Sequence, residues 1–259
     1  MDVFKPGQSF RYASLKRDGH FTQLDMIGGA VSVYSRSGKD ITHKVAWTPW
    51  FQAAQAKAEK DPASRTFFGE MWLPGGVCTD VPHAQCVQDP RLLFQVFGCA
   101  HLEEGARLED VQDDAHDCGL DAIVFWPFAQ KETTREHWNH TPDVEGFVYS
   151  DGNCLRMAKE KPMRSADLII TGWTEGEGKY AGLIGALKVS TCDGEELASV
   201  SGMTDDVRRL ISSSPESFLG RVCEVQYQNI AKLGRLRHPV FLGFRDDKRP
   251  EECGINQIK

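Results

Sequence analysis

The apolar positions of the chain follow two periods, and the helical period predicts four helices. One apolar stripe at near-helical spacing consists of Leu108, Val111, Ala115 and Cys118. This spacing places the four side chains on one face of a helix. Residues 50–60 and 205–211 predict two more helices. Residues 89–99 predict a fourth, because Pro90 occupies a favoured position in a first helical turn.

Short runs of β-branched and aromatic residues predict buried strands at residues 121–128, 146–149 and 167–171. Residues 21–35 alternate around the pair Gly28-Gly29, which predicts a hairpin, because glycine accepts the positive φ angles of tight turns. Lys16 is then expected in the turn just before this hairpin.

The spacing of glycines and apolar residues changes after Gly172. From Trp173 onward, glycines punctuate short apolar runs, a pattern typical of a small β-barrel. No low-complexity linker marks the boundary. We therefore expect an α+β protein with two domains, residues 1–172 and residues 173–259.

Composition indicates a soluble globular class. The chain has 259 residues, of which 41% are hydrophobic and 26% charged, enough for two modest domains. No apolar run approaches the ~20 residues of a membrane span, and the first ten residues lack a signal-peptide pattern. The eight cysteines are scattered without a CxxC pair, which predicts reduced thiols. We expect a cytoplasmic protein.

The net charge of −7 argues against a protein that coats nucleic acid non-specifically. Much of the acidic excess lies in residues 103–121, which we interpret as a solvated helix face. The remaining surface can therefore carry a basic groove. A candidate stripe for phosphate contacts consists of Arg208, Arg209, Lys232, Arg235 and Arg237.

Lys16 is the candidate nucleophile. A lysine that attacks phosphorus must be neutral, and deprotonating an unperturbed lysine at pH 7 costs roughly 4–5 kcal/mol. Lys159 and Lys161 lower this cost if their i, i+2 spacing on a strand points both to one face. Glu70 and Glu145 offer carboxylates for a divalent metal, each beside a glycine that permits close approach of a ligand. Each feature taken singly is more commonly an exposed charge at a strand end.

The order of the motifs resembles the motif set of the covalent nucleotidyltransferases, the superfamily of DNA ligases, RNA ligases and mRNA capping enzymes. The motifs are Lys-Arg-Asp-Gly at 16–19, Ser-Arg-Ser-Gly at 35–38, Phe-Gly-Glu at 68–70, Val-Phe-Trp-Pro at 124–127, Glu-Gly-Phe-Val at 145–148, Lys-Glu-Lys at 159–161 and Arg-Asp-Asp-Lys at 245–248. Residues 176–187, 201–208 and 236–248 are similar to the barrel domain of ATP-dependent DNA ligases, which narrows the resemblance to that family.

The resemblance implies a nucleotidyltransferase (adenylation) domain of antiparallel sheets flanked by helices, followed by an OB-fold β-barrel. It also implies that Lys16 attacks the α-phosphorus of ATP and becomes a lysyl-AMP. Lys159 and Lys161 then neutralise the α-phosphate, while Arg245 and Lys248 of the barrel orient the leaving pyrophosphate.

The same resemblance implies the nucleotide contacts. Phe125 stacks on the adenine, Glu70 holds the ribose, and Arg36 contacts the nucleotide or the DNA 5′-phosphate. Glu145 binds Mg²⁺ or Mn²⁺, with Glu70 as a second ligand. The nucleotide pocket also includes Ser14 and Leu15.

Three positions depart from the pattern of the family, and one of them is Phe68, which replaces the acid that often precedes Gly69. Phe21 stands where ligases usually carry an arginine, so the contact to nucleic-acid phosphate must come from another residue, such as Arg11 or Arg17. Ser14 stands where many ligases carry a glutamate that accepts a hydrogen bond from the adenine amine.

The expected substrate is nicked double-stranded DNA, bound by a monomer of minimal two-domain type, with no membrane partner. The zinc cysteines of NAD-dependent ligases are missing, which favours ATP. Two alternatives stay open: an RNA ligase or capping-type nucleotidyltransferase, and a catalytically silent nucleic-acid-binding protein.

Overall fold

The computed structural model describes residues 2–5, 7–103, 106–130, 141, 143–152, 156–194, 196–231 and 234–258. The chain divides into two compact units, Met1–Lys161 and Pro162–Lys259. The division therefore lies before the boundary after Gly172 that the texture of the sequence predicts. Strand β11 (Arg164–Glu175) runs through that position, because the glycine-rich texture begins near the end of this strand and not at its start.

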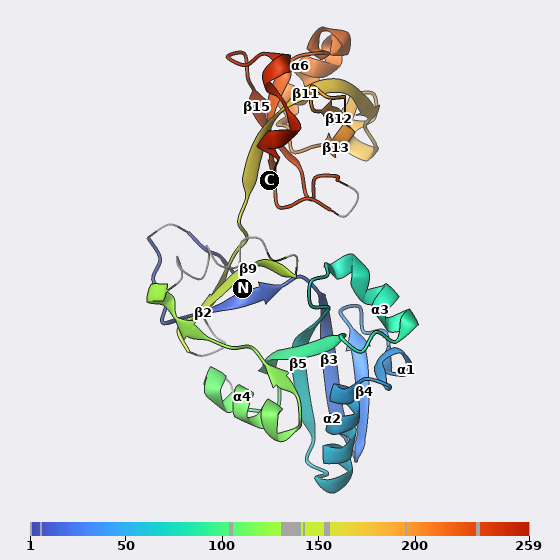
Figure 1. The fold of residues 1–259 in the computed structure, drawn as a ribbon, viewed down its shortest axis with the longest axis vertical. Coiled ribbons are helices and arrows are strands. Elements are labelled where there is room, and N and C mark those ends of the chain that lie inside the picture. Colours follow the sequence, from blue (N-terminus) through green and yellow to red (C-terminus); the bar gives the residue numbers. More distant parts are fainter. Residues whose placement is uncertain are drawn as a thin grey trace. The chain divides into compact units, whose positions relative to one another are not determined.

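The first unit contains two five-stranded sheets (Figure 1). One sheet has the strand order β1-β10-β9-β2-β8. Its strands are β1 (Asp2–Val3), β2 (Tyr12–Arg17), β8 (Trp126–Pro127), β9 (Val144–Ser150) and β10 (Met157–Glu160). Lys16 thus lies in β2 and not in the turn before the hairpin, because the chain turns only at Asp18-Gly19.

The other sheet has the order β4-β3-β5-β6-β7. Its strands are β3 (His20–Ile27), β4 (Ala30–Ser35), β5 (Arg65–Trp72), β6 (Leu93–Cys99) and β7 (Asp121–Ala122). The predicted hairpin is confirmed: β3 pairs with β4 around Gly28 and Gly29, whose φ angles are 60° and 82°. Such positive angles at both central residues suit a tight hairpin turn.

Helices cover the second of these sheets. They are α1 (Thr42–Val45), α2 (Pro49–Lys60), α3 (Val81–Val87) and α4 (Leu108–Asp117). In α2 the side chain of Thr48 caps the first turn, and α4 buries the predicted apolar stripe. Both helices pack on the sheet core (Figure 1).

The helix predicted at residues 89–99 is wrong. Asp89 caps a turn instead, and β6 follows it. Phe94 and Val96 are buried while Gln95 is half-buried, which is the period of a strand with one buried face. The run at residues 121–128 also differs from the prediction, since it forms only the short strands β7 and β8 with irregular chain between them.

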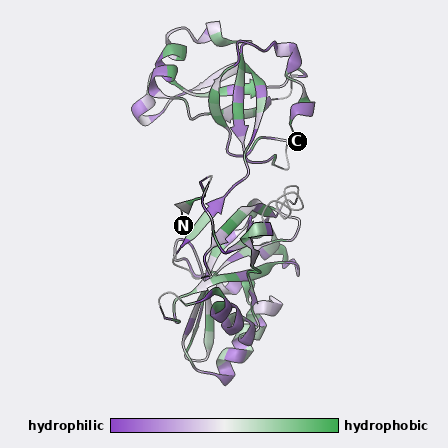
Figure 2. Ribbon diagram, turned by 90° about the vertical axis from the view of Figure 1, so that its left-hand side faces the viewer, coloured by the Kyte–Doolittle hydropathy of each residue, from purple (hydrophilic) through white to green (hydrophobic). Residues whose placement is uncertain are grey.

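The second unit is the predicted barrel. Its strand order is β13-β12-β11-β14-β15, with every neighbouring pair antiparallel. The remaining elements are β12 (Ile184–Ser190), β13 (Glu196–Val200), α6 (Asp205–Ser213), β14 (Val222–Tyr227) and β15 (Val240–Phe244). A parallel bridge between Ser201 and Val240 joins the two edges, which closes the sheet. Apolar and polar residues alternate along these strands (Figure 2).

No helix in the described part of the chain is long and apolar enough to span a membrane.

Arg208 is buried, which removes it from the predicted phosphate-binding stripe. Its side chain is 4% exposed and lies over the ring of Tyr180, 4.0 Å from the ring centroid. Its guanidinium donates hydrogen bonds to the carbonyls of Ile184 and Gly185. Arg208 therefore ties α6 to the start of β12 within the barrel.

We expect Arg208→Met to destabilise the second unit by about 2–4 kcal/mol, because two buried carbonyls lose a charged donor. Thermal unfolding of the full chain measures the effect. Arg209→Met is the control, since this exposed neighbour pairs only with Asp206 among the described residues. Equal decreases in Tm in both variants would contradict the proposal that Arg208 stabilises the barrel by joining α6 to β12.

Candidate active site

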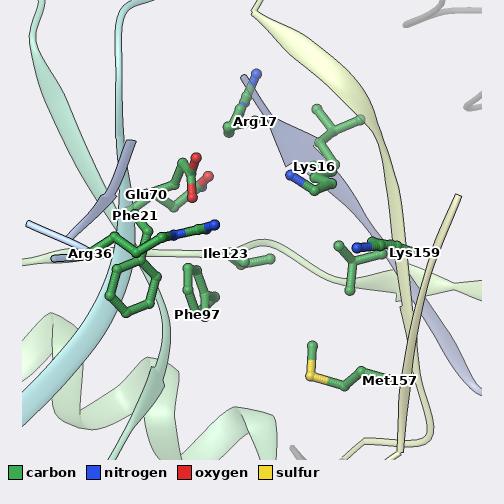
Figure 3. Close-up of a pocket in the computed structure, with 12 residues that line it drawn as sticks. Lys16, Arg17, Phe21, Arg36, Glu70, Phe97, Ile123, Met157 and Lys159 are labelled. Carbon is green, nitrogen blue, oxygen red and sulfur yellow. The ribbon is translucent and has the colours of Figure 1, made fainter. Parts of the chain in front are cut away.

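A cavity of about 230 Å³ lies between the two sheets of the first unit. The β1-β10-β9-β2-β8 sheet contributes Leu15, Lys16, Arg17, Val148, Met157 and Lys159. The other wall consists of Phe21, Arg36, Glu70, Gln95, Phe97 and Ile123. Lys16 and Lys159 approach the cavity from one side, and Arg36 and Glu70 from the other (Figure 3).

A β-bulge places Glu145 beside Lys16. In the β2–β9 pairing, Lys16 lies opposite Gly146 and Arg17 opposite Val144, so that Glu145 is the extra residue. A bulge re-aims the side chain of its extra residue. The carboxylate of Glu145 accepts hydrogen bonds from the amines of both Lys16 and Lys161.

Glu145 stays ionised in this arrangement. Its side chain is only 9% exposed, and burial by itself raises the pKa of a carboxyl. The hydrogen bonds and charges of Lys16 and Lys161 outweigh burial, so that the pKa of Glu145 lies below its ordinary value. The site thus holds one buried carboxylate between two ammonium groups.

Lys159 and Lys161 take different positions at the site. Lys159 is the third residue of β10 and lines the cavity. Lys161 follows the end of β10 and binds Glu145. Both predicted cations therefore lie at the site, although they reach it in different ways.

The glycines beside the two glutamates accommodate the protein's own chain, contrary to the expectation that they admit a ligand. A Cβ at Gly146 would lie 2.1 Å from the carbonyl oxygen of Glu160, and one at Gly69 would lie 2.4 Å from the ring of Phe94. These distances are below any van der Waals contact. The glycines are required by the pairing of β9 with β10 and by packing against β6.

Glu70 faces a different environment from that of Glu145. Burial raises the pKa of Glu70 to about 7, and the negative charge of Glu145 adds to this, while Lys16 and Arg36 oppose it. The backbone amide of Gly19 also donates to its carboxyl group. The Glu70 carboxyl therefore keeps its proton to a higher pH than an exposed glutamate does.

Phe21, the departure from the family pattern, supports Arg36. The guanidinium of Arg36 lies 5.5 Å from the ring centroid of Phe21, and both side chains line the cavity. A cation over an aromatic face is held by the ring quadrupole. Arg36 thus carries a positive charge into the cavity from the end of β4.

The aromatic residue predicted to stack on the base is Phe125, but Phe97 of β6 is the one of these two phenylalanines that lines the cavity. It is the extra residue of a second bulge, because Phe68 pairs with Gly98 and Gly69 with Val96. Phe125 is not among the described lining residues. Residues 93–97, Leu-Phe-Gln-Val-Phe, have a single polar position, so no alternation of polar and apolar residues marked this segment as a strand.

Of the two expected pocket residues before the lysine, only Leu15 lines the cavity. Ser14 is fully buried, and its hydroxyl donates to the carbonyl of Val148 at 3.4 Å.

Arg17 is engaged within the protein. Its guanidinium lies 2.6 Å from the carboxylate of Asp143 and 3.9 Å from the ring centroid of Trp72. Arg11, the other expected phosphate contact, lies over the ring of Tyr12 at 5.7 Å.

Some basic residues of the second unit also form ion pairs within the protein. Arg245 lies 3.0 Å from Asp167 and 2.8 Å from Asp247, and Lys248 follows in the same turn. In the predicted stripe, Arg235 pairs with Glu196, whereas Lys232 lies outside the described residues.

A cluster of three or more His, Cys, Asp or Glu side chains that could hold a metal does not occur among the residues that the structure describes. Glu70 lines the cavity, and the charge of Glu145, which accepts a hydrogen bond from Lys16, contributes to the raised pKa of Glu70.

The raised pKa of Glu70 predicts a pH-dependent stability. The folded protein holds this proton between the ordinary pKa of 4.5 and about 7, whereas the unfolded chain has released it. Stability therefore falls as pH rises through this window. We expect the difference in Tm between Glu70→Gln and the wild type to grow in favour of the variant as pH rises from 4.5 to 7. Each kcal/mol of difference in the free energy of unfolding should change Tm by about 2–4 °C.

Thermal unfolding of the ligand-free protein at several pH values measures this difference. Glu59→Gln, which alters an exposed carboxyl on α2, is the control. A difference between wild type and Glu70→Gln that does not change with pH would refute the assignment.

Comparison with known proteins concerns the second unit most directly. Residues 175–245 match the family model of the DNA ligase OB-like domain. A DNA ligase of Thermococcus onnurineus (strain NA1) is 28% identical over 221 residues, which is 75% of this chain. The chain spans only 37% of the length of that relative.

Solved structures of ligases share the fold of both units. A structure from a study of DNA binding with a minimal scaffold by Lig E DNA ligases has a TM-score of 0.71 at 18% identity, covering 95% of this chain and 98% of the other. The structure named Pmar-Lig_PreS3 has a TM-score of 0.70 at 20% identity, covering 91% and 63%. Residues 175–245 are therefore similar to the DNA ligase OB-like domain, and the chain shares the fold of these ligase structures.

Proposed function

We propose that this protein is an ATP-dependent DNA ligase that seals nicks in duplex DNA through a lysyl-AMP intermediate. The observation that carries the proposal is the amine of Lys16 at the cavity, beside Lys159 and the Glu145–Lys161 pair and across from Arg36 and Glu70. The shared fold and the DNA ligase OB-like domain support it.

In the first step, the Lys16 ammonium releases one proton to solvent, and the neutral amine attacks the α-phosphorus of ATP and gives up a second proton to solvent. The new N–P bond forms as the P–O bond to pyrophosphate breaks, and pyrophosphate leaves with that electron pair. Glu145 orients the amine through its hydrogen bond, and Lys161 holds the same carboxylate in place. Lys159 and Arg36 supply positive charge for the phosphates.

The nucleotide would lie across the cavity. Phe97 offers an aromatic face for the base, and it replaces Phe125 in that role because Phe97 lines the cavity. Glu70 is placed to accept hydrogen bonds from ribose hydroxyls. Leu15, Ile123 and Met157 provide the apolar contacts that such pockets use.

The donor set fits Mg²⁺. This ion commonly uses one or two carboxylates together with substrate phosphates, and Glu70 and Glu145 provide two carboxylates near the phosphate-neutralising cations. When bound, Mg²⁺ or Mn²⁺ would supply charge neutralisation at the phosphates.

The later steps transfer AMP to the 5′-phosphate at the nick, after which the 3′-hydroxyl displaces AMP.

Arg245 and Lys248 of the second unit would orient the pyrophosphate in the first step. We propose that the protein acts on DNA as a monomer in the cytoplasm.

The experiment that tests the function uses α-labelled ATP with magnesium. We expect label on the denatured wild-type protein and none on Lys16→Ala, because this variant lacks the amine that is proposed to attack the α-phosphorus. Lys39→Ala alters an exposed lysine and is expected to label normally.

A chase with nicked DNA is expected to remove the label as the nick is sealed. Label that persists with DNA but is discharged by nicked RNA would favour an RNA ligase. A folded wild type that takes no label would disprove the proposal.

The two phenylalanines give a second prediction. We expect Phe97→Ala to raise the KM for ATP in self-adenylylation roughly 5- to 100-fold, because base stacking contributes about 1–3 kcal/mol. Phe125→Ala is expected to change KM little. Initial rates at several ATP concentrations separate the variants, and a larger effect at Phe125 would reverse the assignment.

A further inference from the structure

Gln95 is the neutral polar side chain among the described residues that line the cavity. The other polar lining groups all carry ionisable side chains, namely Lys16, Arg17, Arg36, Glu70 and Lys159. Ionisable groups suit phosphates and ribose hydroxyls, whereas a carboxamide suits the edge of a nucleobase, which presents donors and acceptors without charge.

The strand places Gln95 beside the aromatic ring of the site. Gln95 lies on β6, two residues before Phe97, and it pairs across the sheet with Glu70. Two residues along a strand span about 7 Å, which is the scale of a purine. A base stacked on Phe97 therefore brings an edge within reach of Gln95.

The orientation of the Gln95 amide is fixed by the backbone. Its Nε2 donates to the carbonyl of Ala122 at 3.3 Å, next to the parallel pairing of β6 with β7. If the amide were reversed, Oε1 would face the carbonyl oxygen of Ala122, and two acceptors would repel each other. The Oε1 atom accepts no hydrogen bond from the described chain, and it is not a buried unsatisfied atom. It is therefore an acceptor open to a ligand.

Ser14 does not compete for this role. Its side chain is fully buried, and its hydroxyl is used by the carbonyl of Val148. Gln112, on α4, donates a hydrogen bond to the carbonyl of Ile123, the residue after the Ala122 that Gln95 contacts. Gln112 does not line the cavity. The two glutamines therefore share a backbone-anchoring role, but only Gln95 also faces the cavity.

We propose that Gln95 selects the nucleobase by accepting a hydrogen bond from the 6-amino group of adenine through its fixed Oε1. Guanine presents an oxygen at the same position, which this acceptor repels. The inference rests on the proposed function, because it names the residue that selects the nucleotide for Lys16.

The test compares ATP, GTP and purine riboside 5′-triphosphate, which lacks the 6-amino group. The readout is the rate of nucleotidylation of the full chain at low nucleotide concentration, followed by intact-protein mass spectrometry. We expect the wild type to prefer ATP over the purine analogue roughly tenfold, the effect of one hydrogen bond of about 1.4 kcal/mol. It should be slower still with GTP.

Gln95→Met should use ATP roughly tenfold more slowly than the wild type while using the purine analogue at the wild-type rate. Gln112→Met is the matched control, because it removes a backbone anchor of the same segment, and it should keep the preference for ATP. Equal losses with ATP and the analogue in Gln95→Met would overturn the inference.

The wild type alone provides an independent test, in case Gln95→Met does not fold. Equal use of ATP and the purine analogue by the wild type would also overturn the role of Gln95, while leaving the proposed function intact. A wild type that accepts none of the three nucleotides would overturn both.

Discussion

The site depends on one irregularity in the pairing of β2 with β9. The bulge that makes Glu145 the extra residue of β9 turns its carboxylate toward Lys16 and Lys161, and Gly146 permits it because any side chain there would meet the backbone of β10. A regular ladder would have placed successive side chains on opposite faces. Lys16, the carboxylate that accepts its hydrogen bond and a second lysine are thus brought together by backbone geometry.

Two glutamates at one cavity differ because their neighbours differ. Glu145 lies between two ammonium groups and has a lowered pKa, whereas burial raises the pKa of Glu70 to about 7. The first is suited to orienting a lysine, and the second to hydrogen bonding with a sugar or, when it is ionised by nearby positive charge, to a cation. Environment, and not residue type, therefore separates their roles.

The barrel motifs include basic residues that are held within the barrel. Arg208 belongs to a motif that resembles those of ligases, yet it is buried against Tyr180 and ties α6 to β12. Arg245 is held by Asp167 and Asp247, so that its guanidinium is oriented by the barrel itself. A basic residue in such a motif is therefore not by itself a contact to DNA.

Local patterns in the sequence determined the hairpin at Gly28-Gly29, the helices α2, α4 and α6, the barrel, and the order of motifs that singled out Lys16 and Glu145. These features depend on neighbours along the chain. The tertiary structure alone decided that residues 93–99 form a strand, that Phe97 lines the cavity, and that Arg208 is buried. Those outcomes depend on pairing partners distant in sequence, which no local period specifies.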